Sequence, residues 1–143
     1  MDLKAQYVFD APPDAVWHRL MDPATIASCL PGVQTFEPAG DNTYRVVITA
    51  GIAAITGSFT GTVTLADQQP PTSYRLVVEG SGKPGFASGE ARVTLTAAAA
   101  GTTVYVDGTM SVGGLIAQVG QRLVGATARM MMDRFFKCLQ SKT

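Results

Sequence analysis

The sequence predicts an α+β fold in which a curved antiparallel sheet of six or seven strands surrounds one long C-terminal helix. Between Val33 and Val112 the chain consists of short runs in which apolar and polar residues alternate, and turn residues separate these runs. The only long helical pattern runs from Gly114 to about Lys142. Strands that are apolar on one side need a single cover, and only this helix is long enough to supply it. The 143 residues suit one domain spanning the whole chain, residues 1–143.

The N-terminal part predicts one strand and two short helices. Leu3, Ala5, Tyr7 and Phe9 alternate with more polar residues, which is typical of a half-buried strand. A helix is expected over Pro13–Met21, because proline suits a first helical turn and Asp14 adds favourable charge there. Asp22-Pro23 ends that helix and begins a second one, expected over Ala24–Ser28.

The central part predicts six further strands joined by short turns. Asp67–Thr72 is expected to be a loop because its two prolines cannot donate to a strand ladder. Short turns make sequence neighbours antiparallel neighbours in the sheet. The expected strands are Val33–Glu37, Tyr44–Ile52, Gly57–Ala66, Tyr74–Gly80, Ala87–Ala97 and Thr102–Val112.

The long helix carries a wide apolar face with unusual contents. At about 100° per residue from Ile116, this face collects Ile116, Gly120, Leu123, Thr127, Met130 and Met131. Gly120 and Thr127 are small where a packed core favours leucine, and methionines fill irregular space. Two interpretations follow: a helix packed directly on the sheet, or a helix that forms one wall of a cavity for an apolar ligand.

Composition and cysteine content exclude several classes of protein. The formal net charge is zero and no basic stripe is present, so nucleic-acid binding is not expected. Cys29 and Cys138 belong to no metal or redox spacing, and we expect buried free thiols in a reducing cytoplasm. No apolar run approaches the roughly 18 residues of a membrane span. The sequence therefore predicts a cytoplasmic protein with at most peripheral membrane contact.

No constellation of catalytic residues is evident. His18 is the only histidine, lies in a short helix and is expected to be structural or solvent-facing. The carboxylates are scattered without a local pair suited to acid–base chemistry. Phosphate-loop, dinucleotide-binding and zinc motifs are absent, so no metal, cofactor or catalytic residue is expected.

Several segments carry a resemblance to a known family. Ala11–Trp17, Asp22-Pro23 and Leu30–Gly32 resemble the opening of the START-like superfamily (SRPBCC), which includes polyketide cyclases and Bet v 1. The remainder resembles more specifically the CoxG family, whose members are named as subunits of carbon monoxide dehydrogenase. The segments that match this family are Gly57–Gly61, Pro70–Tyr74, Gly85–Gly89, Val112–Gly120, Arg122-Leu123 and Phe135-Phe136.

This resemblance implies a helix-grip fold with a deep apolar pocket between sheet and helix. It also implies an accessory role beside a molybdenum-containing, carbon monoxide dehydrogenase-like oxidoreductase, connecting that enzyme to the membrane and its quinones. Many relatives continue into a linker and a membrane-associating tail, whereas this chain ends at Thr143. Membrane attachment through such a tail is therefore not expected.

Two kinds of function compete. The first is a non-enzymatic carrier of a hydrophobic molecule, either a quinone or a lipid. Gly120→Leu or Thr127→Phe is expected to block its uptake. The alternatives are a cyclase- or hydrolase-type enzyme using Tyr7, Tyr44 or Arg134, and a dehydrogenase assembly factor without a ligand. The residues expected to line the pocket are Trp17, Phe59, Phe86, Met110, Val119, Leu123, Thr127 and Met130.

Overall fold

The computed structural model describes residues 1–52 and 55–142, and it confirms the predicted α+β architecture. Two short helices follow the first strand, and one long helix ends the chain. The elements, in order, are β1 (Asp2–Phe9), α1 (Pro13–Met21), α2 (Pro23–Cys29), β2 (Val33–Gly40), β3 (Thr43–Ile52), β4 (Ile55–Gln69), β5 (Ser73–Gly82), β6 (Gly85–Ala98), β7 (Gly101–Gly113), the 3₁₀ helix η1 (Gly114–Val119) and α3 (Gln121–Gln140).

The seven strands form one antiparallel sheet in the order β1-β7-β6-β5-β4-β3-β2. Strands β2 to β7 pair with their sequence neighbours, as short turns require. Strand β1 instead pairs with β7, so the N-terminal strand and the strand before the long helix lie side by side. In β4, a side chain on Gly61 would collide with the backbone of Glu79, so glycine allows β5 to approach closely there.

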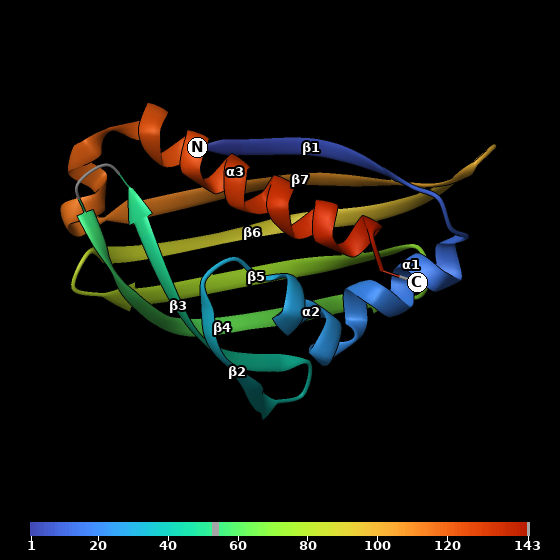
Figure 1. Cartoon of the computed structure of the whole chain (residues 1–143), viewed down its shortest axis with the longest axis horizontal. Coiled ribbons are helices and arrows are strands. Elements are labelled where there is room, and N and C mark those ends of the chain that lie inside the picture. Colours follow the sequence, from blue (N-terminus) through green and yellow to red (C-terminus); the bar gives the residue numbers. More distant parts are fainter. Residues whose placement is uncertain (53–54, 143) are drawn as a thin grey trace.

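The helices cover one face of the sheet. Figure 1 shows α3 lying across that face, while α1 and α2 lie at the end where the chain finishes. Side chains of α3 hold it to the free edge of β1. The Arg129 guanidinium donates to the Lys4 carbonyl at 2.9 Å, and the Gln140 amide donates to the Val8 carbonyl at 2.8 Å. These bonds also occupy edge carbonyls that would otherwise be open to another strand.

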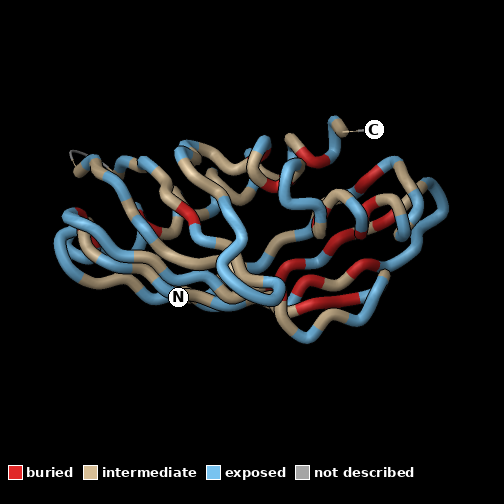
Figure 2. Tube along the Cα trace, turned by 90° about the horizontal axis from the view of Figure 1, so that it is seen from below, coloured by how far each residue is buried: buried red, intermediate tan, exposed pale blue. Residues whose placement is uncertain are grey.

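The packed core is concentrated at one end of the molecule. Figure 2 shows that most buried residues gather near the C-terminus, where α1 and α2 cover the sheet. Phe9, Val16, Val104 and Leu139 are fully buried there. At the opposite end, near η1 and the tips of β3 and β4, the chain is mostly half-buried or exposed.

The predicted start of the long helix is wrong. Residues 114–119 form the 3₁₀ helix η1, and α3 begins only at Gln121. Gly120 separates the two with φ +93° and ψ 151°, a backbone conformation that residues with a side chain rarely adopt. Extrapolating α-helical geometry from Ile116 across this break therefore misplaces the face of α3.

The buried side of α3 differs from the predicted apolar face. Val124, Phe136 and Leu139 are its buried residues, whereas Leu123 and Met130 are 48% and 43% exposed. The true inward direction is rotated by roughly a third of a turn from the one predicted. The helix is amphipathic, as expected, but the predicted phase is wrong.

The predicted free thiols are also wrong. Cys29 at the end of α2 and Cys138 near the end of α3 form a disulfide, with their Cα atoms 5.4 Å apart. The two residues are 109 positions apart in the chain, and sequence spacing alone cannot show that the fold brings them together. The cysteines therefore no longer support a reducing compartment.

A smaller correction concerns the expected loop at Asp67–Thr72. Strand β4 continues through Gln69, with a register shift between Ala66 and Gln69 and a positive φ at Asp67. The connection to β5 is thus only residues 70–72. A bulge absorbs the irregular residues within the ladder.

Candidate ligand-binding site

An apolar cavity of about 320 Å³ lies between the sheet and α3. Strands β4 to β7, with Leu3 of β1, form its floor, α3 forms its roof, and α1 and α2 close one end. This volume is within the range of small-molecule sites in proteins. The cavity is thus a hollow enclosed by the helix and the sheet, in agreement with the second interpretation of the helix face.

Strand β6 creates the space. Its inward positions begin with the small residues Ala87, Gly89 and Ala91 and continue with the large residues Val93 and Leu95. Successive inward positions of a strand lie roughly 7 Å apart. The change from small to large residues therefore marks where the cavity ends and the packed core begins.

The neighbouring strands extend this division across the sheet. Gly89 lies between Val78 of β5 and Met110 of β7 in the strand register. Further along, Val93 lies between Tyr74 and Val106, which are both buried. Val78 is 37% exposed, so the cavity is open to solvent at its end, whereas the row at Tyr74 forms the closed end.

The roof consists of flexible and aromatic side chains from one side of α3. Two methionines among them allow the wall to adapt its shape to an occupant. The roof residues are Ala128, Met131, Met132, Phe135 and Phe136. Leu20 of α1, Ile26 of α2 and the adjoining turn residues Leu30 and Pro31 complete the enclosure.

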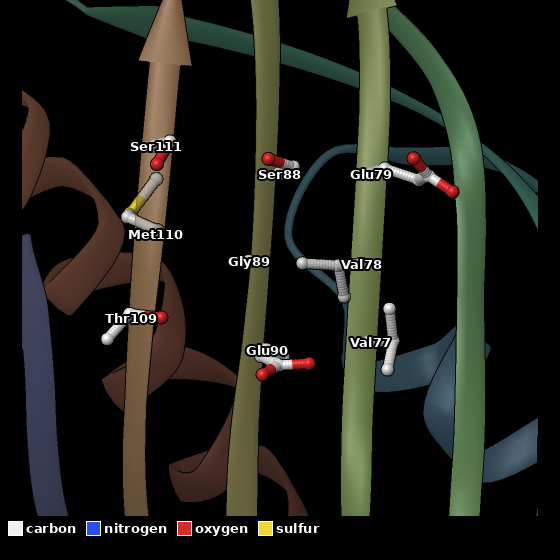
Figure 3. Close-up of a pocket in the computed structure, with 9 residues that line it drawn as sticks. All are labelled: Val77, Val78, Glu79, Ser88, Gly89, Glu90, Thr109, Met110 and Ser111. Carbon is white, nitrogen blue, oxygen red and sulfur yellow. The ribbon is translucent and has the colours of Figure 1, made fainter.

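The opposite face of the sheet is polar at the same place. A shallow depression of about 330 Å³ lies over Gly89, and Figure 3 shows this bare glycine between Val78 and Met110. The polar residues around the depression are Glu79, Ser88, Glu90, Thr109 and Ser111. Glu90 accepts a hydrogen bond from Arg75 at 3.0 Å, so this region is an ordinary solvated sheet face rather than a second apolar site.

Tyr7 of β1 makes a polar contact with α3. Its hydroxyl donates to the Asp133 carboxylate at 2.6 Å, and its ring stacks on Phe136 with centroids 4.3 Å apart. Burial, with the hydrogen bond to Asp133, raises the pKa of Tyr7 well above its ordinary value. Tyr7 does not line the cavity, so this contact positions the helix rather than a ligand.

Met110 alone among the eight predicted pocket residues lines the cavity. Trp17 lies in the core beside it, with its ring edge-on to Tyr74 at a centroid distance of 5.7 Å. Phe86 is 57% exposed and lies on the same side of β6 as Ser88 and Glu90, which faces away from α3. Leu123 and Met130 lie on the outward side of α3.

Phe59, Val119 and Thr127 are half-buried and lie outside the cavity lining. Phe59 shares the inward side of β4 with Val63 and Leu65, which do line the cavity. Gly120 is exposed, and a side chain built there would meet nothing within 4 Å. The backbone conformation, and not reserved space, explains this glycine.

Apart from Met110, the predicted pocket residues missed the floor of the cavity, and they missed its roof. One signal was present: Ala87, Gly89 and Ala91 alternate on one side of β6 and precede two large apolar residues on the same side. Small residues on the concave side of a strand leave volume that a covering helix does not fill. The roof residues could be found only once the true start of α3 was known.

The polar residues considered for catalysis do not meet in the cavity. Tyr44 stacks on Phe36 with centroids 4.8 Å apart, and His18 and Arg134 are exposed. Within residues 1–52 and 55–142, no cluster of three or more histidine, cysteine or carboxylate side chains is arranged to hold a metal. In the same part of the chain, no helix is long and apolar enough to cross a membrane.

Comparison with known proteins identifies a family and a fold. The model of the CoxG family, described as a subunit of carbon monoxide dehydrogenase, matches residues 6–143. A conserved protein from Geobacillus kaustophilus has a similar crystal structure, with 31% identity and a TM-score of 0.93. That match covers 98% of this chain and 93% of the other. No curated protein matches the sequence significantly.

More distant structures show the fold alone. The ZhuI aromatase/cyclase from Streptomyces sp. R1128 is similar with 13% identity and a TM-score of 0.67, covering 98% of this chain and 91% of the other. Ara h 8.0201 is similar with 14% identity and a TM-score of 0.68, covering 98% and 95%. The helix-grip fold expected from the resemblance to polyketide cyclases and Bet v 1 is thereby confirmed.

Proposed function

The protein belongs to the CoxG family, and we propose that it binds one apolar molecule in the cavity beneath α3 as an accessory protein of an oxidoreductase. The observation that carries the proposal is the cavity itself, about 320 Å³ in volume and lined almost entirely by apolar side chains. Apolar side chains around an unoccupied cavity that opens to solvent lack packing contacts on one side and face water. Occupation by an apolar ligand would restore those contacts.

The partner and the ligand are the finer parts of the proposal. The family description names a subunit of carbon monoxide dehydrogenase, which supports a molybdenum-containing, carbon monoxide dehydrogenase-like oxidoreductase as the partner. We propose that the ligand is a quinone or another lipid that the protein carries between this enzyme and a membrane. In this proposal the protein touches the membrane surface at most peripherally.

We favour binding over catalysis because the described residues that line the cavity do not include a set of reactive groups. Tyr7, Tyr44 and Arg134, the residues considered for a cyclase or hydrolase, are not among those that line it. General acid–base chemistry needs such groups within hydrogen-bond reach of the substrate. The proposal would fail in favour of an enzyme if polyketide-like or ester substrates were turned over and the activity were lost on changing one of these three residues.

Native mass spectrometry of the purified protein, followed by organic extraction, tests the proposal directly. We expect a bound apolar molecule at one copy per chain. Co-purification with a dehydrogenase but without an extractable ligand, together with no binding of added quinone or lipid, would instead indicate an assembly factor.

A matched pair of variants tests the location. Ala128 lines the cavity from α3, whereas Ala126 is exposed two residues earlier on the same helix. We expect Ala128→Phe to abolish recovery of the ligand, because the larger side chain occupies the cavity. Ala126→Phe should leave recovery unchanged. Equal recovery from both folded variants would place the ligand elsewhere.

A further inference from the structure

Among the described residues that line the cavity, Tyr74 carries the only polar side chain that lies on the inward face of the sheet. Ser88, Glu90 and Thr109 also border the cavity, but their side chains lie on the opposite face of the sheet, where they surround the outer depression. Tyr74 is only 3% exposed and lines the closed end of the cavity. The described inward-facing lining is therefore apolar apart from one phenolic side chain.

In the described part of the chain no hydrogen bond to the Tyr74 hydroxyl is found, and burial alone accounts for its shifted pKa. The hydroxyl also keeps some accessible surface. If it were fully enclosed, it would be a buried polar atom without a partner, and no such atom occurs in residues 1–52 and 55–142. Tyr74 lines the cavity from the inward side of β5. A phenylalanine ring would fill the same position, and it would avoid the free-energy cost of a buried hydroxyl without a partner. Packing therefore does not explain why this residue is a tyrosine.

The surroundings of Tyr74 fix its ring in place. Trp17 packs edge-on against it with an interplanar angle of 89°, and Val93 is its register partner on β6. Burial raises the pKa of Tyr74 well above its ordinary value, so the hydroxyl stays protonated and able to donate. The other inward-facing side chains described around the cavity are apolar and offer no second polar partner to a water at this hydroxyl, whereas water in a protein interior needs two to four.

We propose that Tyr74 is the polar anchor of the ligand, donating a hydrogen bond to an acceptor oxygen, such as a carbonyl, at the end of the molecule that enters first. This inference rests on the proposed function, because it assumes that the cavity is occupied. The apolar remainder of the ligand lies along Ala91 and Gly89 toward Met110 and Val78. From Tyr74 to Val78 the floor spans roughly 13 Å, which sets the length of the enclosed part.

The test compares two probes of equal size on three proteins. Acetylnaphthalene carries a carbonyl, and isopropylnaphthalene, substituted at the same ring position, carries a methyl group in its place. Their affinities are measured by titration calorimetry for the wild type, Tyr74→Phe and Tyr7→Phe. The Tyr7→Phe control removes a hydroxyl that is bonded to Asp133 outside the cavity.

We expect Tyr74→Phe to weaken binding of the ketone about tenfold, as for the loss of one buried hydrogen bond. Its affinity for the hydrocarbon should be unchanged. Tyr7→Phe should keep the wild-type preference for the ketone.

An equal loss of affinity for both probes in Tyr74→Phe would assign Tyr74 a packing role. An unchanged affinity of Tyr74→Phe for the ketone would also contradict the anchor. If neither probe binds the wild type, the proposed function falls together with the anchor. If both bind and no protein prefers the ketone, only the anchor falls.

Discussion

The two ends of the space beneath α3 share the same strands and the same helix, yet one is packed and the other is hollow. At the packed end, Tyr74, Val93 and Val106 lie side by side across three strands, and α1 and α2 cover them. At the hollow end, Gly89 lies between Val78 and Met110. Figure 2 shows the result as a concentration of buried residues at one end.

This difference shows that side-chain volume on one strand can divide a core from a binding site. The backbone of β6 continues unchanged from Ala87 to Leu95, so the topology does not create the cavity. Three small residues leave space above this part of β6. The distance between α3 and the sheet is set by the larger residues further along the strand. The closed end thus provides the stability, and the open end keeps its space because the helix is held elsewhere.

Removing the disulfide bond at the closed end should have the largest effect on stability. The disulfide between Cys29 and Cys138 ties α2 to α3 there and joins residues 109 positions apart. Cys138→Ser should lower the free energy of unfolding by about 4 kcal/mol, because a long loop gains freedom in the unfolded chain. Urea unfolding with and without reductant measures this. Reductant should lower the stability of the wild type alone, and an equal response of both proteins would contradict the assignment.

Truncating one side chain at each end should have the next largest effect, and the loss of stability should differ between the two ends. Leu139 is fully buried at the closed end, whereas Met131 is half-buried and borders the cavity. Leu139→Ala should cost about 3 kcal/mol, because it leaves a new cavity in a packed region. Met131→Ala should cost less than half as much, since it enlarges an existing space. Equal losses in chemical denaturation would show that the hollow end is packed after all.

A substitution of Gly120, the residue before α3, tests whether this glycine is needed for its backbone conformation or for space in the cavity. Gly120→Ala should lower the free energy of unfolding by about 2 kcal/mol through backbone strain, because φ there is +93°. Binding of an apolar probe should not change, since Gly120 does not line the cavity. As a control, Gly125→Ala inside α3 should raise stability by up to about 1 kcal/mol. If a folded Gly120→Ala protein no longer bound the probe, Gly120 would have to be part of the binding site.

The smallest effect is expected at the contact between β1 and α3. Tyr7→Phe should lower the free energy of unfolding by about 1 kcal/mol, because it removes the hydrogen bond to Asp133 while keeping the stack on Phe136. Thermal unfolding measures the change. In an Asp133→Ala background the same substitution should have almost no effect, and a full loss there would mean that the hydroxyl acts through another group.

Sequence reasoning predicted the fold better than the site, for reasons visible at particular residues. The period-two alternation of β4 and β7 reports directly which residues face inward. Aromatic character favours an inward Phe86, yet Ala87, Gly89 and Ala91 occupy the inward positions of β6. A shift of one residue moves a side chain to the other face of a sheet. The choice of Leu123 and Met130 depends on a helical phase that Gly120 interrupts.

The sequence by itself determined the α+β fold, the order of its elements, the amphipathic final helix and the family, because these depend on local periodicity and on segments contiguous in the chain. Only the tertiary structure decided which side of α3 faces the sheet, that Cys29 and Cys138 form a bond, and that Tyr74 lines the closed end of a cavity. These features depend on distances between residues far apart in sequence, and no local pattern records such distances.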